Sequence, residues 1–468
     1  MTVNHNVPAQ VDGMKHPYLV FAARPEHGHT YPILQIARDM IRRGFEATIL
    51  TGEQYGEDII KMGARPVTLP HYNPTPEALG ELAKVSSKLQ TLAWGLRHIV
   101  APQMPIWYGT LKETLETLRL ERPGQQFVIV SDLAFTGQQP LVRGAPLPKG
   151  FSVRPPVIHI NVVPLAMPSI DTGPFGLGLP PDSSESGRAR NKLLNAIYYG
   201  PDGPYGPFGA EHIRLLKSLG ATDIPSTVEA WGYTTSFPDI TLQVCSPSLE
   251  FPRSDLPDNV HFVGCLPRKP IGPDYEYPQW LKDIVSPTDG STRKKRIIGV
   301  AQGTIAVDYT DLIIPTIQGL ANDDDVVVIA LLGKKGATLP EGVTVPANAR
   351  VVDYMPYEVV LNHADVWVAN AGYGGFTQGV MHGVPMVLAG DTQDKPDIAM
   401  IREWSGVACN LRTGTPTPEQ VAKGVREIYS NDSYKARVVE VQKENEAMNC
   451  LDAVEKHIWD IFAKMGVI

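Results

Sequence analysis

Residues 366–394 read VWVANAGYGGFTQGVMHGVPMVLAGDTQD and contain two apolar runs separated by a glycine-rich turn. The first run, Val366–Val368, is followed by Asn370 and by glycines at 372, 374 and 375, and the second run is Val384–Leu388. This order predicts a strand, a tight loop, a helix and a second strand. Glycines at such a turn let backbone N–H groups approach a ligand, and the positive end of the helix dipole points to the same place. The natural ligand of such a turn is a phosphate, but taken alone the pattern is more typical of a plain packing turn, which uses the same residues.

The flanking residues resemble the donor-binding signature of the family 1 UDP-glycosyltransferases, which have the GT-B fold. That signature has an aromatic residue and a proline, then H-C-G-W-N-S-x-x-E or a G-G-x-G variant, then G-V-P and an Asp-Gln pair. The matching residues are Tyr354, Pro356, Gly372, Tyr373, Gly383, Val384, Pro385 and Asp394. Three positions depart from the signature: Asn370 replaces His, Gln378 replaces Glu, and Lys395 replaces Gln. The G-Y-G-G turn with Asp-Lys-Pro looks most like fungal and some bacterial members.

The resemblance implies a set of donor-binding residues on several loops. Gln302–Thr304 match the family's S-F-G-T/S, whose hydroxyl and amides face the nucleotide phosphates. The complete expected set is Gly28, Gln302, Gly303, Thr304, Tyr354, Met355, Tyr357, Asn370, Gly372, Tyr373, Gly374, Gly375, Gln378, Asp394 and Lys395.

A second resemblance lies near the amino terminus, in the loop RPEHGHTY between the expected strands Tyr18–Ala23 and Phe45–Thr51. It is similar to the family's P-x-x-G-H-x-x-P. Spacing alone does not choose between His27 and His29, but the resemblance selects His29 as the base that deprotonates the acceptor and leaves His27 to shape the loop. The expected strand Phe127–Val130 is followed by Asp132, which the resemblance pairs with His29. Taken alone, an Asp at this position is more typical of a turn or a helix cap than of a catalytic partner.

Composition sets limits on the class of protein. With 468 residues the chain is long enough for two domains, and 43% hydrophobic with 20% charged residues fits a globular protein. The net charge of −8 offers no basic surface for nucleic acid or an anionic membrane. The four cysteines lack metal-ligand spacing, and no secretory signal or run of about 18 apolar residues is present. We therefore expect a cytoplasmic chain with no integral membrane segment.

Two regions leave alternatives open. The aromatic residues of 71–120, among them Trp94, Trp107 and Tyr108, wall an acceptor pocket or belong to ordinary core. The stretch 164–209, rich in Pro, Gly and Ser, is predicted to hold little regular structure and to form either mobile loops over the acceptor side or a surface insertion.

The expected fold class is α/β of the GT-B type, with two Rossmann-like doubly wound domains facing a cleft. The expected boundaries are 15–265 for the acceptor domain, 266–280 for a linker, 281–440 for the UDP-sugar domain, and 441–468 for a helix that packs back on the first domain.

The resemblance implies an inverting hexosyltransferase that moves a sugar, with glucose expected, from a UDP-sugar to a small apolar acceptor such as a phenolic, flavonoid, polyketide or sterol. No metal or other cofactor is expected. The rival functions are a GT-B sugar-nucleotide epimerase or hydrolase and a catalytically inactive GT-B partner protein. A dehydrogenase is weaker, because neither strand-to-helix loop reads G-x-G-x-x-G.

Overall fold

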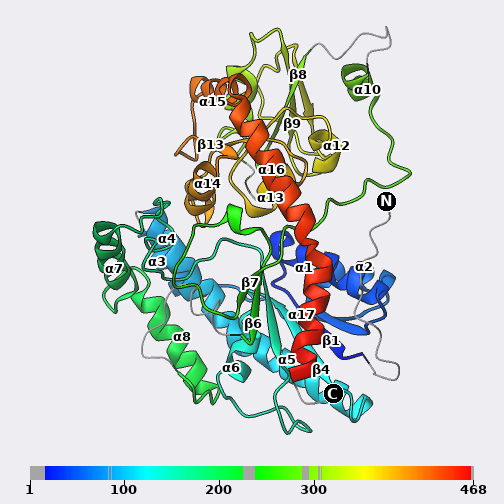
Figure 1. Cartoon of the computed structure of the whole chain (residues 1–468), viewed down its shortest axis with the longest axis vertical. Coiled ribbons are helices and arrows are strands. Elements are labelled where there is room, and N and C mark those ends of the chain that lie inside the picture. The colour runs from blue at the N-terminus through cyan, green and yellow to red at the C-terminus, as the bar shows by residue number, and fades with distance from the viewer. Residues whose placement is uncertain are drawn as a thin grey trace.

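Two parallel sheets, each covered by helices on both faces, make up the computed structural model (Figure 1). The structure describes residues 16–82, 84–85, 87–224, 238–286, 295–303, 306 and 308–464. These two doubly wound domains confirm the predicted GT-B architecture.

The amino-terminal sheet has the strand order β3-β2-β1-β4-β5-β6-β7, and all of its strand pairs are parallel. Its strands are β1 (Tyr18–Ala22), β2 (Ala47–Thr51), β3 (Arg65–Thr68), β4 (Phe127–Asp132), β5 (Val157–Asn161), β6 (Ile240–Gln243) and β7 (Val260–Phe262). The order reverses between β1 and β4. Ligands of such sheets bind beyond the carboxyl ends of the strands at this reversal, where the predicted base and its partner lie.

The carboxyl-terminal sheet repeats this plan with the order β10-β9-β8-β11-β12-β13. Its strands are β8 (Arg296–Ala301), β9 (Val326–Leu331), β10 (Ala349–Val352), β11 (Val366–Ala369), β12 (Met386–Leu388) and β13 (Ala408–Asn410). Here the order reverses between β8 and β11. The predicted phosphate loop follows β11, and the segment beginning at Gln302 follows β8, so both lie at the reversal.

The strands read as continuous apolar runs because each contributes to two cores. Leu19 and Phe21 of β1 pack in the core below helix α1, whereas Val20 and Ala22 pack in the core on the opposite face.

Helices of the amino-terminal domain are α1 (His27–Arg42), α2 (Gly56–Lys61), α3 (Pro76–Leu82), α4 (Lys88–Gly95), α5 (Ala101–Glu121), α6 (Gln139–Val142), α7 (Glu185–Tyr199) and α8 (Gly206–Ser218). A π-helical turn, Leu96–Val100, joins α4 to α5, and short 3₁₀ turns occupy Glu53–Tyr55, Thr136–Gln138 and Pro247–Leu249. The later helices are α10 (Gln279–Val285), α11 (Ile313–Gly319), α12 (Tyr357–Leu361), α13 (Tyr373–Met381), α14 (Lys395–Trp404), α15 (Pro418–Ser430), α16 (Asp432–Met448) and α17 (Cys450–Lys464).

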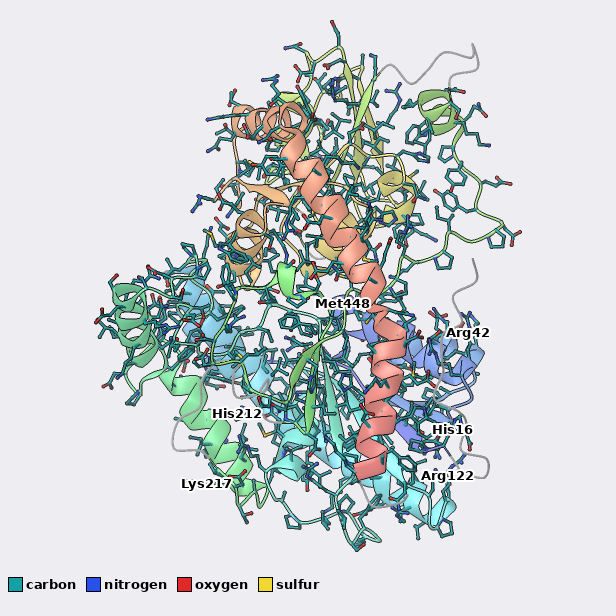
Figure 2. The ribbon with its side chains drawn as sticks, viewed as in Figure 1. His16, Arg42, Arg122, His212, Lys217 and Met448 are labelled. Carbon is teal, nitrogen blue, oxygen red and sulfur yellow. The ribbon has the colours of Figure 1, made fainter. Side chains whose placement is uncertain are left out.

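The last two helices connect the domains. Helix α16 packs on α13, and α17 packs on α1, where Arg43 forms ion pairs with Asp452 and Glu455. Between the helices, Asn449 adopts a left-handed conformation with φ 47°. Figure 2 shows Met448 at this junction. The chain therefore crosses between the domains at residue 449, later than the expected boundary of 441, because Val438 and Val441 still pack in the second domain's core.

The prediction for residues 164–209 is wrong in part, since helix α7 lies within this stretch. The Ser184 hydroxyl accepts a hydrogen bond from the Gly187 N–H and caps the helix. The prolines and most of the glycines fall at 164–181 and 200–207, outside α7, so an average over the whole stretch concealed a helical segment.

The aromatic residues of 71–120 belong to the core. Trp107 is fully buried and stacks on Phe135 with 5.5 Å between ring centroids, while Trp94 and Tyr108 are also buried. Within the described ranges, no helix combines the length and the hydropathy needed to cross a bilayer.

Candidate active site

A histidine and an aspartate meet at the carboxyl edge of the first sheet. His29, the third residue of α1, lies with its Nδ1 3.0 Å from Oδ1 of Asp132, the last residue of β4. The Asp132 side chain is fully buried, whereas that of His29 is 23% exposed. A carboxylate on Nδ1 fixes the tautomer that leaves Nε2 free to accept a proton, which is the arrangement of a general base.

Burial lowers the pKa of His29, but the charge and hydrogen bond of Asp132 raise it more, so the net pKa is above 6.5. The Arg24 guanidinium opposes this rise and Glu26 adds to it. The carboxylate therefore increases the basicity of the imidazole.

His27 has a different environment. Its Nδ1 shares a hydrogen bond of 3.1 Å with the Tyr55 hydroxyl, and its ring stacks on Tyr31 with 5.1 Å between centroids. These contacts are those of a residue that shapes the loop, as the sequence predicted.

The glycine-rich turn of the second domain opens helix α13. Gly372 is the residue that precedes the helix, and a Cβ added at Gly374 would meet no atom within 4 Å. Ala371, just before the turn, has φ 58°, a strained conformation for a residue with a side chain. An open helix amino terminus at the strand-order reversal is a suitable site for a phosphate group.

The segment after β8 touches this turn. The Asn370 Nδ2 donates to the backbone oxygen of Gln302, which lies before Gly303. Both polar atoms of the Gln302 side chain are used within the protein, since Nε2 donates to Asp308 O at 2.7 Å and Oε1 accepts from Ile313 N at 2.8 Å. The Gln302 side chain therefore has a structural role, and the donor contact expected of this residue is one of its backbone. Thr304 lies outside the described residues.

The predicted donor residues after β10 differ in exposure. Tyr354 is 48% exposed and can offer a ring face to a ligand, whereas Met355 is buried in the core. Tyr357 packs on Trp367 and shares a hydrogen bond with the backbone of Gly303. Tyr357 is half-buried and Met355 is buried, so the donor contacts expected of Met355 are limited to its backbone.

Gln378 lies on α13, one turn beyond the glycines. Its Oε1 is buried and has no hydrogen-bond partner among the described residues. A buried acceptor without a donor is costly, and a ligand hydroxyl could satisfy it.

Asp394 and Lys395 stand at the start of α14. Burial raises the pKa of Asp394, while the positive charges of Lys395 and His29 act to lower it. His29 belongs to the first domain and Asp394 to the second. The base of one domain and the expected sugar ligand of the other are therefore within electrostatic reach across the cleft.

The Tyr373 side chain turns away from the cleft mouth. It is 8% exposed, and its hydroxyl accepts from Gln243 Nε2 at 3.1 Å and donates to Val244 O at 3.4 Å. The expected donor contact through this side chain is corrected to a contact between the domains.

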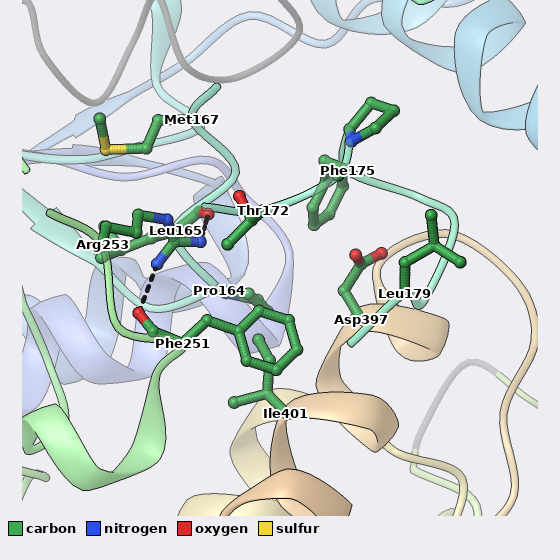
Figure 3. A pocket seen from close by; sticks show the side chains of 12 residues that line it. Pro164, Leu165, Met167, Thr172, Phe175, Leu179, Phe251, Arg253, Asp397 and Ile401 are labelled. Carbon is green, nitrogen blue, oxygen red and sulfur yellow. Dashed lines mark hydrogen bonds between the residues drawn. The ribbon is translucent and has the colours of Figure 1, made fainter. Parts of the chain in front are cut away.

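A small pocket lies between residues 164–179 and α14 (Figure 3). Apolar residues such as Phe175, Leu179 and Ile401 line it together with the polar residues Thr172, Arg253 and Asp397. Its acidic group is Asp397, which accepts a hydrogen bond from Gly176 N at 2.7 Å. No local pattern pointed to Asp397, because Gly176, its hydrogen-bond partner, is 221 positions away.

The pKa of the buried Asp397 carboxyl group provides a test of its contact with Gly176. Burial and the neighbouring Asp394 raise its pKa from 3.8 to about 7, although the N–H groups of Gly176 and Gly178 oppose the rise. Because the folded-state pKa is the higher one, the fold loses stability as pH increases from about 4 to 7 and regains none above it; the full cost is about 4 kcal/mol.

We expect Asp397→Asn, whose amide oxygen can still accept from Gly176, to raise the melting temperature at pH 8 by several degrees and to change it little at pH 4.5. The exposed Asp202→Asn serves as the control. Scanning calorimetry at both pH values measures the difference, and equal effects at the two pH values would contradict the burial argument.

Comparison with known proteins decides the family. The chain is 39% identical over 447 residues to UDP-glucosyltransferase 1 of Beauveria bassiana (strain ARSEF 2860), covering 94% of each chain. It is 33% identical to UDP-glucosyltransferase A1 of Starmerella bombicola, covering 95% of this chain and 92% of that one. The chain belongs to the family 1 UDP-glycosyltransferases.

Two further comparisons agree with this membership. Residues 315–461 match the family model of the erythromycin biosynthesis protein CIII-like, C-terminal domain. The crystal structure of the glycosyltransferase of kitacinnamycin has a TM-score of 0.66 at 20% identity and covers 95% of this chain and 98% of its own. That similarity establishes the GT-B fold. This UDP-glycosyltransferase is therefore an enzyme that transfers sugar from a UDP-sugar.

Proposed function

We propose that this UDP-glycosyltransferase moves glucose from UDP-glucose to a hydroxyl of a small, largely apolar acceptor, with inversion at the anomeric carbon and without a metal ion. The observation that carries the proposal is the His29–Asp132 pair within electrostatic reach of Asp394. Both relatives described above are named glucosyltransferases, which supports glucose. A cytoplasmic location stays a prediction.

In the proposed reaction, His29 Nε2 takes the proton of the acceptor hydroxyl while that oxygen bonds to the anomeric carbon. The bond from this carbon to the phosphate oxygen breaks, and UDP leaves with the electron pair. Negative charge grows on UDP as the bond lengthens. The helix-end amides at Gly372–Gly375 therefore stabilise the transition state more than the ground state.

UDP release tests the proposal when it is measured over several UDP-sugars with a pooled panel of phenols, flavonoids and sterols. Acceptor-dependent release, greatest with UDP-glucose and yielding a β-glucoside, is the expected result. UDP release without any acceptor would favour an epimerase or hydrolase. UDP-sugar binding without turnover would favour an inactive partner protein.

Gln378 gives a separate prediction for the donor site. We expect Gln378→Ala to weaken UDP binding roughly fivefold to tenfold, the effect of one lost hydrogen bond to a ribose hydroxyl. Gln378→Glu, which restores the family's usual residue, should bind normally. Calorimetry with UDP and its 2′-deoxy and 3′-deoxy analogues measures this: the loss should vanish with one analogue. Identical losses of affinity with all three ligands would show that Gln378 does not bind a ribose hydroxyl.

A further inference from the structure

The segment Gln243–Leu249, which begins at the end of β6, is the place where the first domain supports the second. Three helices of the second domain contact it. The Arg402 guanidinium of α14 donates to Leu249 O, and Asn445 of α16 accepts from Ser246 N at 2.9 Å. Tyr373 of α13 is the third contact. Helices α13, α14 and α16 of the second domain thus all contact this one segment of the acceptor domain.

Tyr373 is the contact that reaches the donor site directly. It is the first residue of α13 and lies between Gly372 and Gly374, the residues placed around the phosphate. Its backbone therefore belongs to the phosphate loop while its hydroxyl lies between Gln243 and Val244 of the other domain. When the phosphate loop shifts, the Tyr373 hydroxyl moves with it, and a hydroxyl held by the other domain restricts the movement of the loop.

The hydrogen bonds continue into the acceptor domain. Gln243 Oε1 accepts from Asn161 Nδ2, and Gln243 Nε2 also donates to Val163 O at 3.1 Å. Val163 precedes the segment that lines the pocket in Figure 3. Asn161 and Gln243 are completely buried. A buried polar group without a hydrogen-bond partner destabilises the fold. These hydrogen bonds therefore favour the one arrangement of the side chains in which the groups are paired.

We propose that Tyr373 is a positioning residue that couples occupancy of the donor loop to the acceptor domain through Gln243. The proposal rests on the placement of UDP at Gly372–Gly375. A bound diphosphate orders the loop, the loop fixes the Tyr373 ring, and the hydroxyl then stabilises the end of β6 and the acceptor-side segment at Val163. The two half-sites are thereby aligned for transfer.

Hydrogen exchange of the full chain tests the coupling without any acceptor. In the wild type, saturating UDP should slow amide exchange both in the phosphate loop and in peptides covering residues 240–249. In Tyr373→Phe, UDP should still protect the loop but no longer protect residues 240–249. Tyr18→Phe is the matched control: Tyr18 is buried, and its hydroxyl shares a hydrogen bond of 2.9 Å with the Thr48 hydroxyl inside the first domain.

The outcomes separate the coupling from a merely structural role. A structural role would speed exchange of residues 240–249 equally with and without UDP and preserve the protection by UDP, which would overturn the proposal. Loss of UDP binding in Tyr373→Phe would also overturn it, because the hydroxyl would then be needed by the loop itself. Failure of the wild type to bind UDP would instead refute the proposed donor site, and the coupling with it.

Steady-state kinetics supply the second readout once an acceptor is known. We expect Tyr373→Phe to lower kcat roughly fivefold to tenfold, the equivalent of one hydrogen bond, with the Kd for UDP changed by less than about twofold. Gln243→Leu should lower kcat similarly, and the double variant should be no worse than either single one. Additive losses would show that the two residues act independently.

Discussion

Replacing His29 with alanine is expected to abolish most transfer to alcohols, with a loss of roughly 10² to 10⁴ in kcat, the usual contribution of a general base. An alcohol is a poor nucleophile until its proton is being removed, and His29 lies at the sheet edge with Asp132 on its Nδ1. The affinity for the UDP-sugar should change little, because His29 belongs to the opposite domain. Initial rates with an alkyl alcohol acceptor, together with calorimetry of UDP, measure the two effects.

His27→Ala is the matched control for this substitution, since His27 is in the same loop and is held by Tyr55 and Tyr31. It should retain turnover. An ionised phenol would be a poor acceptor for the test because it needs no base. Near-wild-type turnover of His29→Ala with an alkyl alcohol would show that His29 is not the general base.

The pH dependence follows from the same pair. His29 acts as a base only when neutral, and its pKa is raised above 6.5 by Asp132, so kcat/KM should rise with pH through that higher pKa. Asp132→Asn removes the charge, which should move this limb to lower pH and reduce kcat. For stability the sign is opposite: the charged pair stabilises the fold below pH 6.5, and this contribution is lost as pH rises through the folded-state pKa.

Much of the fold was predictable because it depends on local patterns. Val366–Ala369 and the other buried strands are continuous apolar runs, and each is followed by the turn or helix that doubly wound sheets require. The contact between His29 and Asp132 was predictable from the loop motif that contains His29 and from the strand end at Asp132, whereas their catalytic roles stay a prediction. Each of these two signals depends only on residues that are close to one another in the sequence.

The missed features depend on contacts between distant segments. Tyr373 matched an aromatic position of the signature, but its orientation is decided by Gln243, which is 130 residues away. Gln302 matched the phosphate segment, yet its side chain is used by Asp308 and Ile313 in the following loop. Helix α7 was concealed by the prolines and glycines on either side of it. For Tyr373 and Gln302 the local sequence identified the segment correctly, but it did not show which residues their side chains contact.

Gly374→Val is expected to weaken UDP binding by roughly 100-fold while leaving the protein folded. An added Cβ at Gly374 meets no protein atom within 4 Å, so the space beside it is open, and valine is no worse than glycine inside a helix. That open space lies at the amino terminus of α13, at the reversal of strand order, where the backbone N–H groups must approach the diphosphate closely. A branched side chain would hold the phosphates away, and charge-assisted hydrogen bonds weaken steeply with distance.

Gly80→Val is the matched control, because Gly80 is also a helical glycine with nothing within 4 Å of an added Cβ, but it lies on α3. Calorimetry of UDP binding, with circular dichroism to confirm folding, measures the effect. A folded Gly374→Val variant that binds UDP as tightly as Gly80→Val would place the diphosphate elsewhere.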